Sequence, residues 1–230
     1  MKVRWLLPAA CAICVALEAA AQTQPTQTQK EVIEVTATKI AEDVLLVPAS
    51  VTIVDGDDLH ARNARDLQTA LALVGGVSIA PGGDAGPAGS IPEMWGLREF
   101  DAFLLVVDGV PWGGAFNPDT AALDMENIDR IEVVRGAAPV MYGATSFVGV
   151  IHVIHREPGA PATARVSLGN LRSGGGSVSL PISQSAALRQ SLNVSYDKQG
   201  FRDRGTNWDR AHALYRLASS LGGGTLRFGV

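Results

Sequence analysis

The residues that could do metal or redox chemistry in this sequence are two cysteines and two histidines. Cys11 and Cys14 are spaced as C-x-x-C, a pattern typical of a redox pair or half of a metal site. They lie inside an apolar run, however, and no second pair follows. His152 and His155 are three residues apart in a strand-like segment, so their side chains face opposite sides and cannot share a metal there. We therefore expect no metal site.

Sequence signatures of catalysis and of nucleic-acid binding are also missing. Serine, histidine and aspartate occur without a nucleophile-elbow pattern, and no phosphate-binding or dinucleotide-binding glycine pattern appears. The 19 Lys and Arg residues against 23 Asp and Glu give a net charge of −4, which offers no basic footprint for nucleic acid. Charged residues are only 18% of the chain and glycines number 25, which favours a turn-rich β protein. We expect no enzyme, no cofactor and no nucleic-acid partner.

The N-terminal 21 residues have the pattern of a secretory signal peptide. Lys2 and Arg4 precede an apolar run from Trp5 to Leu17, and three alanines follow at 19–21. A transmembrane helix is the alternative, but a span needs about 20 apolar residues and this run is shorter. Cleavage before Gln22 would remove both cysteines. The exported chain could then enter a membrane only through β-strands.

Two short segments follow the signal peptide. Residues 22–30 (QTQPTQTQK) are polar and of low complexity, which predicts a flexible tether. Residues 31–39 (EVIEVTATK) are rich in β-branched side chains and have no partner sequence nearby. They are predicted to be a strand that pairs with the sheet edge of another protein. The alternative is that they form the first strand of the next domain.

Residues 55–75 carry helix signals. Asp57 and Asp58 can cap a short helical turn, which we favour over a calcium site. Asn63 with Asp66 three residues later resembles a capping box, and Gly75 is expected to end the helix. The apolar stripe of this helix consists of Leu67, Ala70, Leu71 and Val74.

Strand signals surround this helix and continue to residue 154. Asp108-Gly109 after the apolar run 103–107 is a strong hairpin signal, and residues 110–112 begin the return strand. The Gly/Pro-rich stretch 81–92 is expected to be a functional or disordered loop. The strands are predicted at 48–54, 77–80, 103–107, 128–134 and 148–154.

From residue 162 onwards the sequence consists of short segments in which apolar residues alternate with polar or small ones, and turn residues separate these segments. The segments are 164–168, 176–182, 187–196, 209–219 and 225–230, and the turns are 170–175, 181–185, 197–207 and 222–224. Such alternation is typical of a transmembrane barrel, although a soluble sandwich uses it too. Five strands cannot close a membrane barrel, which needs at least about eight. We therefore expect the sequence to be a fragment.

Three stretches resemble the TonB-dependent outer-membrane receptor family. They are 31–39, 65–77 (RDLQTALALVGGV) and 104–154, the last with LVVDGVP, IDRIEVVRG, YGA and GVIHVI in order. The resemblance implies an α+β plug domain with a small mixed sheet, followed by the first antiparallel strands of a transmembrane β-barrel. The implied organisation is signal peptide 1–21, tether 22–30, coupling segment 31–39, plug 40–158 and truncated barrel 159–230.

The family resemblance also implies transport rather than catalysis. A receptor in the outer membrane would import a scarce nutrient such as a ferric siderophore, with cobalamin and haem as other ligands. TonB of the inner-membrane energy complex would pull on the coupling segment, pairing with it by β-augmentation. The coupling residues would be Val32, Ile33, Glu34, Val35 and Thr36.

Loop residues of the plug are candidates for ligand binding and for attachment to the barrel. Aromatic and arginine side chains suit a planar, anionic chelate. The candidates are Trp95, Arg98, Trp112 and Phe116; the alternative is that the two tryptophans only wedge the plug against the barrel. Arg135 matches a family arginine that pairs with barrel carboxylates as a plug–barrel latch. Trp95-Gly96 stands where the family has a second such arginine, and His152 replaces a usual asparagine.

Two rival functions belong to other classes. A truncated, non-transporting plug would act as a binding protein in the periplasm, or would be the product of a decayed gene. A secreted enzyme with a β-rich domain is the other rival, and it lacks a catalytic set. The sequence does not name the ligand, because specificity in the family lies mostly in barrel loops beyond residue 230.

Overall fold

The computed structural model describes residues 34–35, 42–43, 50–72, 74–80, 91–97, 103–112, 120, 123–136, 148–202, 207–221 and 224–229. All of them belong to one unit, Glu34–Val230. The predicted signal peptide, the tether and most of the 81–92 loop lie outside the described residues. Among the described residues, no helix is long and apolar enough to cross a membrane.

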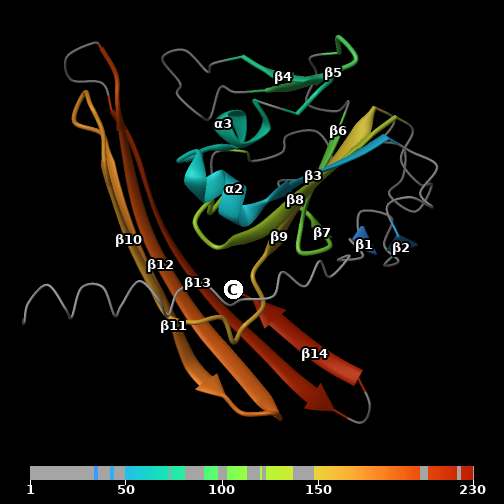
Figure 1. Cartoon of the computed structure of the whole chain (residues 1–230), viewed down its shortest axis with the longest axis vertical. Helices are drawn as coiled ribbons and strands as arrows, with labels where there is room; N and C mark the ends of the chain where they lie inside the picture. The colour runs from blue at the N-terminus through green and yellow to red at the C-terminus, as the bar shows by residue number, and fades with distance from the viewer. Residues whose placement is uncertain are drawn as a thin grey trace, which may run out of the picture. The chain divides into compact units, whose positions relative to one another are not determined.

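A mixed five-stranded sheet, here called the core sheet, organises the first half of the chain (Figure 1). Its order is β3-β8-β9-β6-β7, and β6 and β9 run parallel whereas the other pairs are antiparallel. The strands are β3 Ser50–Asp55, β6 Phe103–Val107, β7 Val110–Pro111, β8 Ile128–Arg135 and β9 Gly149–His155. All of β6 is buried, as expected for an apolar run in a central strand. The predicted α+β unit with a mixed sheet is confirmed.

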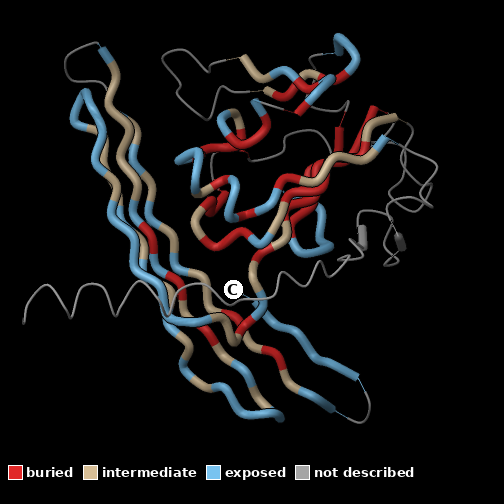
Figure 2. The backbone as a smooth tube through the Cα atoms, in the orientation of Figure 1, coloured by how far each residue is buried: buried red, intermediate tan, exposed pale blue. Residues whose placement is uncertain are grey.

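Apolar side chains fill both faces of the core sheet. One face, with α2 Gly56–Ala61 and α3 Leu67–Leu71, forms the main core, which includes Phe103, Ile131 and Ile151. The predicted helix stripe is part of this core and is fully buried. The other face has a smaller cluster of Leu104, Val106, Val134 and Val150. Figure 2 shows the buried residues concentrated in this half of the chain.

The predicted helix caps were wrong by a few residues. Asp55 rather than Asp57 caps α2, and its side chain accepts from the backbone N–H of Asp57 at 2.7 Å. Asp66 rather than Asn63 caps α3 and forms a capping box with Thr69. The reason is backbone geometry: Asp66 is extended with φ −146°, whereas Asn63 lies in the left-handed region with φ 52°.

The end of α3 was also misplaced. The helix stops at Leu71 with Ala72 as its C-cap, and the left-handed residue of the following turn is Gly76 with φ +78° rather than Gly75. Val77 then begins β4. The helix is therefore shorter than its apolar stripe, whose last member lies in the turn.

Two small sheets accompany the core sheet. β4 Val77–Ile79 pairs with β5 Pro92–Met94, and β1 Glu34–Val35 pairs with β2 Glu42–Asp43. Glu34–Val35 therefore has its described pairing outside the core sheet. Such a short two-stranded pairing is marginally stable at best.

The core sheet, α2, α3 and the segments that connect them are here called the core domain. A second five-stranded sheet, here called the wall sheet, follows it. Its strands pair with their sequence neighbours in an antiparallel meander. They are β10 Thr163–Leu168, β11 Gly174–Gln184, β12 Leu188–Gly200, β13 Asn207–Leu221 and β14 Gly224–Gly229. Strands β11 and β12 are longer than predicted, because 181–184 and 197–200 continue them instead of turning.

The two faces of the wall sheet differ in chemistry. Large apolar side chains share one face and are exposed: Val166, Leu168, Val178, Leu180, Val194, Tyr196, Leu226 and Phe228. The opposite face carries polar and charged residues that contact the core domain or the linker after β9: Arg165, Ser177, Ser195, Arg210, Arg216 and Arg227. Apolar outside and polar inside is the pattern of a membrane barrel strand.

Gly149 is needed where β9 begins. A Cβ at this position would lie 2.5 Å from the Val134 carbonyl oxygen and 2.9 Å from the Met94 sulfur. We expect Gly149→Ala to destabilise the core domain by about 1–3 kcal/mol, the usual cost of overpacking. Faster amide hydrogen exchange in β8 and β9 would report it. Gly75→Ala is the matched control, because its nearest atom is 3.7 Å away; equal exchange in both variants would contradict the prediction.

Candidate functional site

The most connected charged group joins the wall sheet to the α2–α3 segment. Asp197 of β12 and Arg210 of β13 are register partners on the inner face. Arg65 donates from Nε to Asp197 Oδ1 at 2.7 Å, and its Nη2 bonds to the same oxygen and to the Lys198 carbonyl. Arg210 donates in the reverse direction, to the carbonyls of Leu123 at 2.7 Å and of Arg65. Hydrogen bonds thus run in both directions: the α2–α3 segment donates to the wall sheet, and the wall sheet donates back to the core domain.

A second charged group lies further along β13. Arg216 donates to the Arg156 carbonyl at 2.7 Å, and its Nη2 lies 3.7 Å from Asp108 Oδ1. Asp108 also accepts the backbone N–H of His155 at 3.0 Å, and its Oδ2 lies 2.9 Å from His155 Nδ1. Asp108 and Gly109 both have positive φ, as a two-residue hairpin turn requires. The carboxylate of Asp108 therefore connects the β6–β7 hairpin both to β9 and to the wall sheet.

The Asp108 carboxylate is held in its charged form. Burial raises the pKa of Asp108, but the hydrogen bonds and charge of His155 and the charge of Arg216 outweigh burial, so that its pKa lies below the usual value. A carboxyl with a lowered folded-state pKa stabilises the fold fully above its unfolded pKa of about 4, and this contribution is lost as pH falls through the folded value.

We expect Asp108→Asn to weaken the protection of β6 and β9 at pH 7. The difference from wild type should begin to shrink below about pH 4, where the carboxyl of the unfolded chain takes up a proton, and should be lost as pH falls through the lower folded-state pKa. Hydrogen exchange of the two strands, corrected for intrinsic rates, would test this between pH 7 and pH 3. Asp58→Asn, at an exposed carboxylate of α2, is the control. A difference that persists unchanged at pH 3 would contradict the prediction.

Acids in the segment before β8 contact the first wall strands. Glu126 accepts from Arg165 at 3.1 Å and from the Ser177 hydroxyl at 2.9 Å, and Asp124 accepts from the Ser195 hydroxyl at 3.2 Å. These residues line a cavity of about 320 Å³. Asn193 also lines it, buried, and neither end of its amide has a hydrogen-bond partner among the described residues. The cavity is polar enough to hold water against that amide.

The centre of the core sheet contains a buried carboxylate. Glu132 is 0% exposed and accepts from Arg130 Nε at 2.9 Å. The Gly109 N–H donates to His152 Nε2 at 3.0 Å, which leaves His152 Nδ1 facing Glu132 at 3.8 Å. Burial raises the pKa of Glu132, but His152 and Arg130 outweigh it and lower the pKa. His152 is thus a structural residue that links the hairpin to β8.

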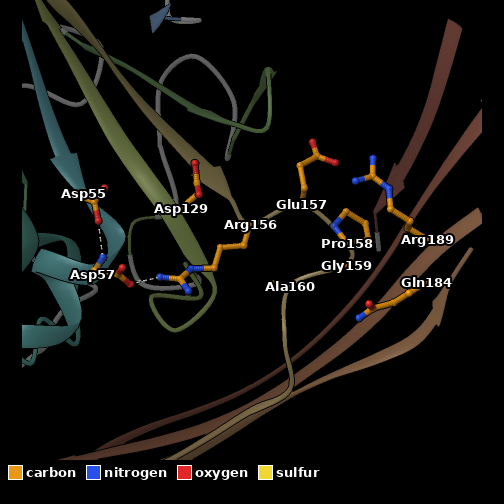
Figure 3. Close-up of a pocket in the computed structure, with 10 residues that line it drawn as sticks. All are labelled: Asp55, Asp57, Asp129, Arg156, Glu157, Pro158, Gly159, Ala160, Gln184 and Arg189. Carbon is orange, nitrogen blue, oxygen red and sulfur yellow. Dashed lines mark hydrogen bonds and ion pairs between the residues drawn. The ribbon is translucent and has the colours of Figure 1, made fainter. Parts of the chain in front are cut away.

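The linker between the two sheets lines a cavity of about 530 Å³ (Figure 3). Figure 3 shows Arg156 reaching Asp57, the ion pair that joins the linker to α2. Glu157 pairs with Arg227 of β14 at 2.9 Å. No group of three or more potential metal ligands occurs among the described residues. The cavity is therefore a polar junction between the linker and both sheets.

A larger cavity of about 720 Å³ lies between the β6–β7 hairpin and strands β13 and β14. Trp112, predicted as a ligand contact, lines it together with His155 and Phe228. Trp95 lies elsewhere: it follows Met94, whose sulfur approaches Gly149 at the opposite end of β9 from His155. Figure 1 shows β5 and β7 well apart. The structure therefore does not bring the two tryptophans together.

The other predicted site residues are only partly described. Arg98, Phe116, Val32, Ile33 and Thr36 lie outside the described residues. Glu34 and Val35 form β1. The coupling and ligand-binding assignments remain predictions.

Arg135, the predicted latch, is bonded within the core domain. It donates to the Gly75 carbonyl and to the hydroxyls of Ser50 and Thr52, both at 2.8 Å. Its Nε is buried without a hydrogen-bond partner among the described residues. A pairing with barrel carboxylates remains a prediction for this residue.

Sequence analysis did not identify the arginines that join the core domain to the wall sheet. Arg65 was placed in a helix region, and Arg210 and Arg216 were only part of a strand. One signal was available: Arg210 and Arg216 are separated by an even number of residues in the predicted 209–219 strand and so share a face. Their partners could not be found, because they lie far away in sequence.

Comparison with known proteins identifies the first half of the chain. Residues 43–150 match the model of the TonB-dependent Receptor Plug Domain. The iron-regulated outer membrane virulence protein of Vibrio cholerae is 32% identical over 148 residues, which are 60% of this chain and 22% of that protein. A vitamin B12 transporter of Photobacterium profundum is 27% identical over 159 residues, 66% of this chain and 26% of the transporter.

Solved structures share the fold of both sheets. The ferric-catecholate import receptor Fiu of E. coli K12 superposes with a TM-score of 0.66 at 20% identity, over 84% of this chain and 28% of Fiu. The pyoverdine receptor FpvA of Pseudomonas aeruginosa gives 0.67 at 18% identity, over 85% of this chain and 29% of FpvA. This chain thus spans between a fifth and a third of the length of the relatives it matches. Residues 43–150 are therefore a plug domain of the TonB-dependent receptor kind, and the antiparallel strands after them are typical of the barrel of these outer-membrane receptors.

Proposed function

We propose that the receptor of which this chain is part imports a ferric siderophore across the outer membrane by TonB-dependent active transport. The observation that supports this best is a plug domain bonded to the inner face of a sheet whose other face is apolar. Such a plug closes a barrel in lipid and must be rearranged for a ligand to pass. Relatives that carry siderophores by name, including pyoverdine and ferric-catecholate receptors, favour the iron chelate.

Cobalamin is the second candidate ligand. Its support is the sequence likeness to vitamin B12 transporters, which covers about as much of this chain as the likeness to the iron-regulated protein. Both ligand classes are large, scarce metal complexes. Uptake experiments can therefore separate them within one assay.

Coupling to TonB is proposed to use the segment around Val35. In β-augmentation an extended strand pairs with a partner's sheet edge through its backbone. The pairing of Glu34–Val35 with Glu42–Asp43 spans only two residues. A pairing this short can be released at small cost, which suits a segment that must change partners.

Trp95 supports the proposed ligand contact better than Trp112 does. Trp95 is 69% exposed and has φ 56°, a strained conformation for a bulky residue that often marks a functional position. Trp112 lines the cavity between the hairpin and the wall sheet, which favours the alternative that it wedges plug against barrel. Arg98 and Phe116 are proposed as further ligand contacts.

The test is uptake by a strain that lacks the receptor gene and carries the full gene on a plasmid. Iron-labelled catecholate and hydroxamate siderophores and labelled cobalamin would be offered with and without functional TonB. We expect TonB-dependent uptake of at least one siderophore. Cobalamin uptake alone would assign the second ligand. Receptor present in the membrane without TonB-dependent uptake of any of them would contradict the proposal, and recovery in the soluble periplasm would indicate a binding protein.

A further inference from the structure

Arg210 is almost completely removed from solvent, with its side chain 11% exposed. A buried guanidinium is costly unless its N–H groups find acceptors and its charge is compensated. Two acceptors are plug carbonyls, those of Leu123 and Arg65, and the charge is compensated by Asp197, its partner across β12 and β13. The guanidinium also lies over the Trp208 ring, 5.0 Å from the ring centre. Arg210 is therefore fixed in one orientation, directed at the plug.

Arg65 closes a ring of bonds with the same two wall residues. Its guanidinium donates to Asp197, while its own carbonyl accepts from Arg210. Asp197 thus holds one arginine from each side of the interface. Because each member orients the next, the three residues should act as one unit rather than as separate contacts.

We propose that Asp197, Arg65 and Arg210 form an anchor that positions the plug on the wall sheet, with Arg210 as its central residue. The anchor secures the α2–α3 connection and the segment that begins at Leu123. It differs from the predicted latch because it uses both polarities: the plug arginine Arg65 donates to the wall carboxylate of Asp197, and the wall arginine Arg210 donates to plug carbonyls. The anchor makes these two segments the fixed side of the plug.

Hydrogen exchange of the full receptor in outer-membrane vesicles tests the anchor without any ligand. We expect Arg210→Gln to speed exchange of residues 62–72 and 123–127 by about tenfold, the effect of losing one charge-assisted hydrogen bond. Exchange of β9 should stay as in wild type. Arg189→Gln is the matched control, because Arg189 is an exposed arginine of β12. Equal exchange in the Arg210→Gln and Arg189→Gln proteins would overturn the proposal.

Double variants separate an anchor from general destabilisation. Asp197→Asn combined with Arg65→Gln should speed exchange no more than either change alone, since both break one unit. Additive effects would overturn the proposal. Arg210→Lys should restore part of the protection, because the ammonium keeps the charge but not the planar fork. Where Arg210→Gln lowers the amount of receptor in the membrane, Arg65→Gln gives the same test from the plug side. The exchange measurement does not depend on uptake, so its failure is distinct from failure of the proposed function.

Discussion

Val35→Pro is expected to reduce energy-dependent uptake at least about tenfold while ligand binding at the cell surface persists. Proline lacks a backbone N–H and so removes one hydrogen bond from a strand that pairs through its backbone. One such bond contributes about 1 kcal/mol, and the fixed ring obstructs the neighbouring pairs as well. Uptake and binding of the same labelled chelate, measured on the same cells, would show the separation.

Val35→Thr is the control for this substitution. Threonine keeps the backbone donor and the branched β-carbon, so uptake should stay close to wild type. Unchanged uptake in the proline variant would remove the coupling role from this segment. Loss of both binding and uptake would instead indicate that Val35 supports the fold.

Val178→Arg is expected to reduce the amount of assembled receptor in the outer membrane severely. Val178 lies on the exposed apolar face of β11. An arginine on the lipid face costs about 2–4 kcal/mol near the bilayer midplane. Folded receptor in purified outer membranes, measured by its altered electrophoretic mobility before heating, would report the loss.

Ser179→Arg is the matched control on the next residue of the same strand. Ser179 faces inward and lines the cavity of about 320 Å³ that also contains Asp57, Asp124 and Glu126. These carboxylates can receive a new guanidinium, so assembly should continue. Equal assembly of the two variants would contradict the assignment of an outer, lipid-facing side to this sheet.

The fold of the core domain could be predicted because its local signals agree with its tertiary environment. The run at 103–107 is apolar at every position and is buried at every position. Asp108-Gly109 adopts the hairpin turn that its composition predicts. Helix caps were less predictable, because Asn63 and Asp66 are both good caps and only the path of the chain decides between them.

The wall sheet was harder to delimit, because its inner face meets a polar plug instead of an apolar core. Ser183, Asp197 and Lys198 have the composition of turn residues, yet they lie within strands. Local composition cannot distinguish a turn from a strand whose inward side chains pair with charged groups. The anchor was invisible for a related reason: Arg65 and Asp197 are 132 positions apart.

Three of the acceptors that receive wall arginines are main-chain carbonyls, those of Arg65, Leu123 and Arg156. Any residue type at these positions supplies the same oxygen. Related receptors could therefore vary the Leu123 side chain and still bind Arg210, whereas the Arg65 side chain is needed for its own bond to Asp197. Methods that infer contacts from correlated substitutions would consequently overlook this attachment, even where every homologue keeps it.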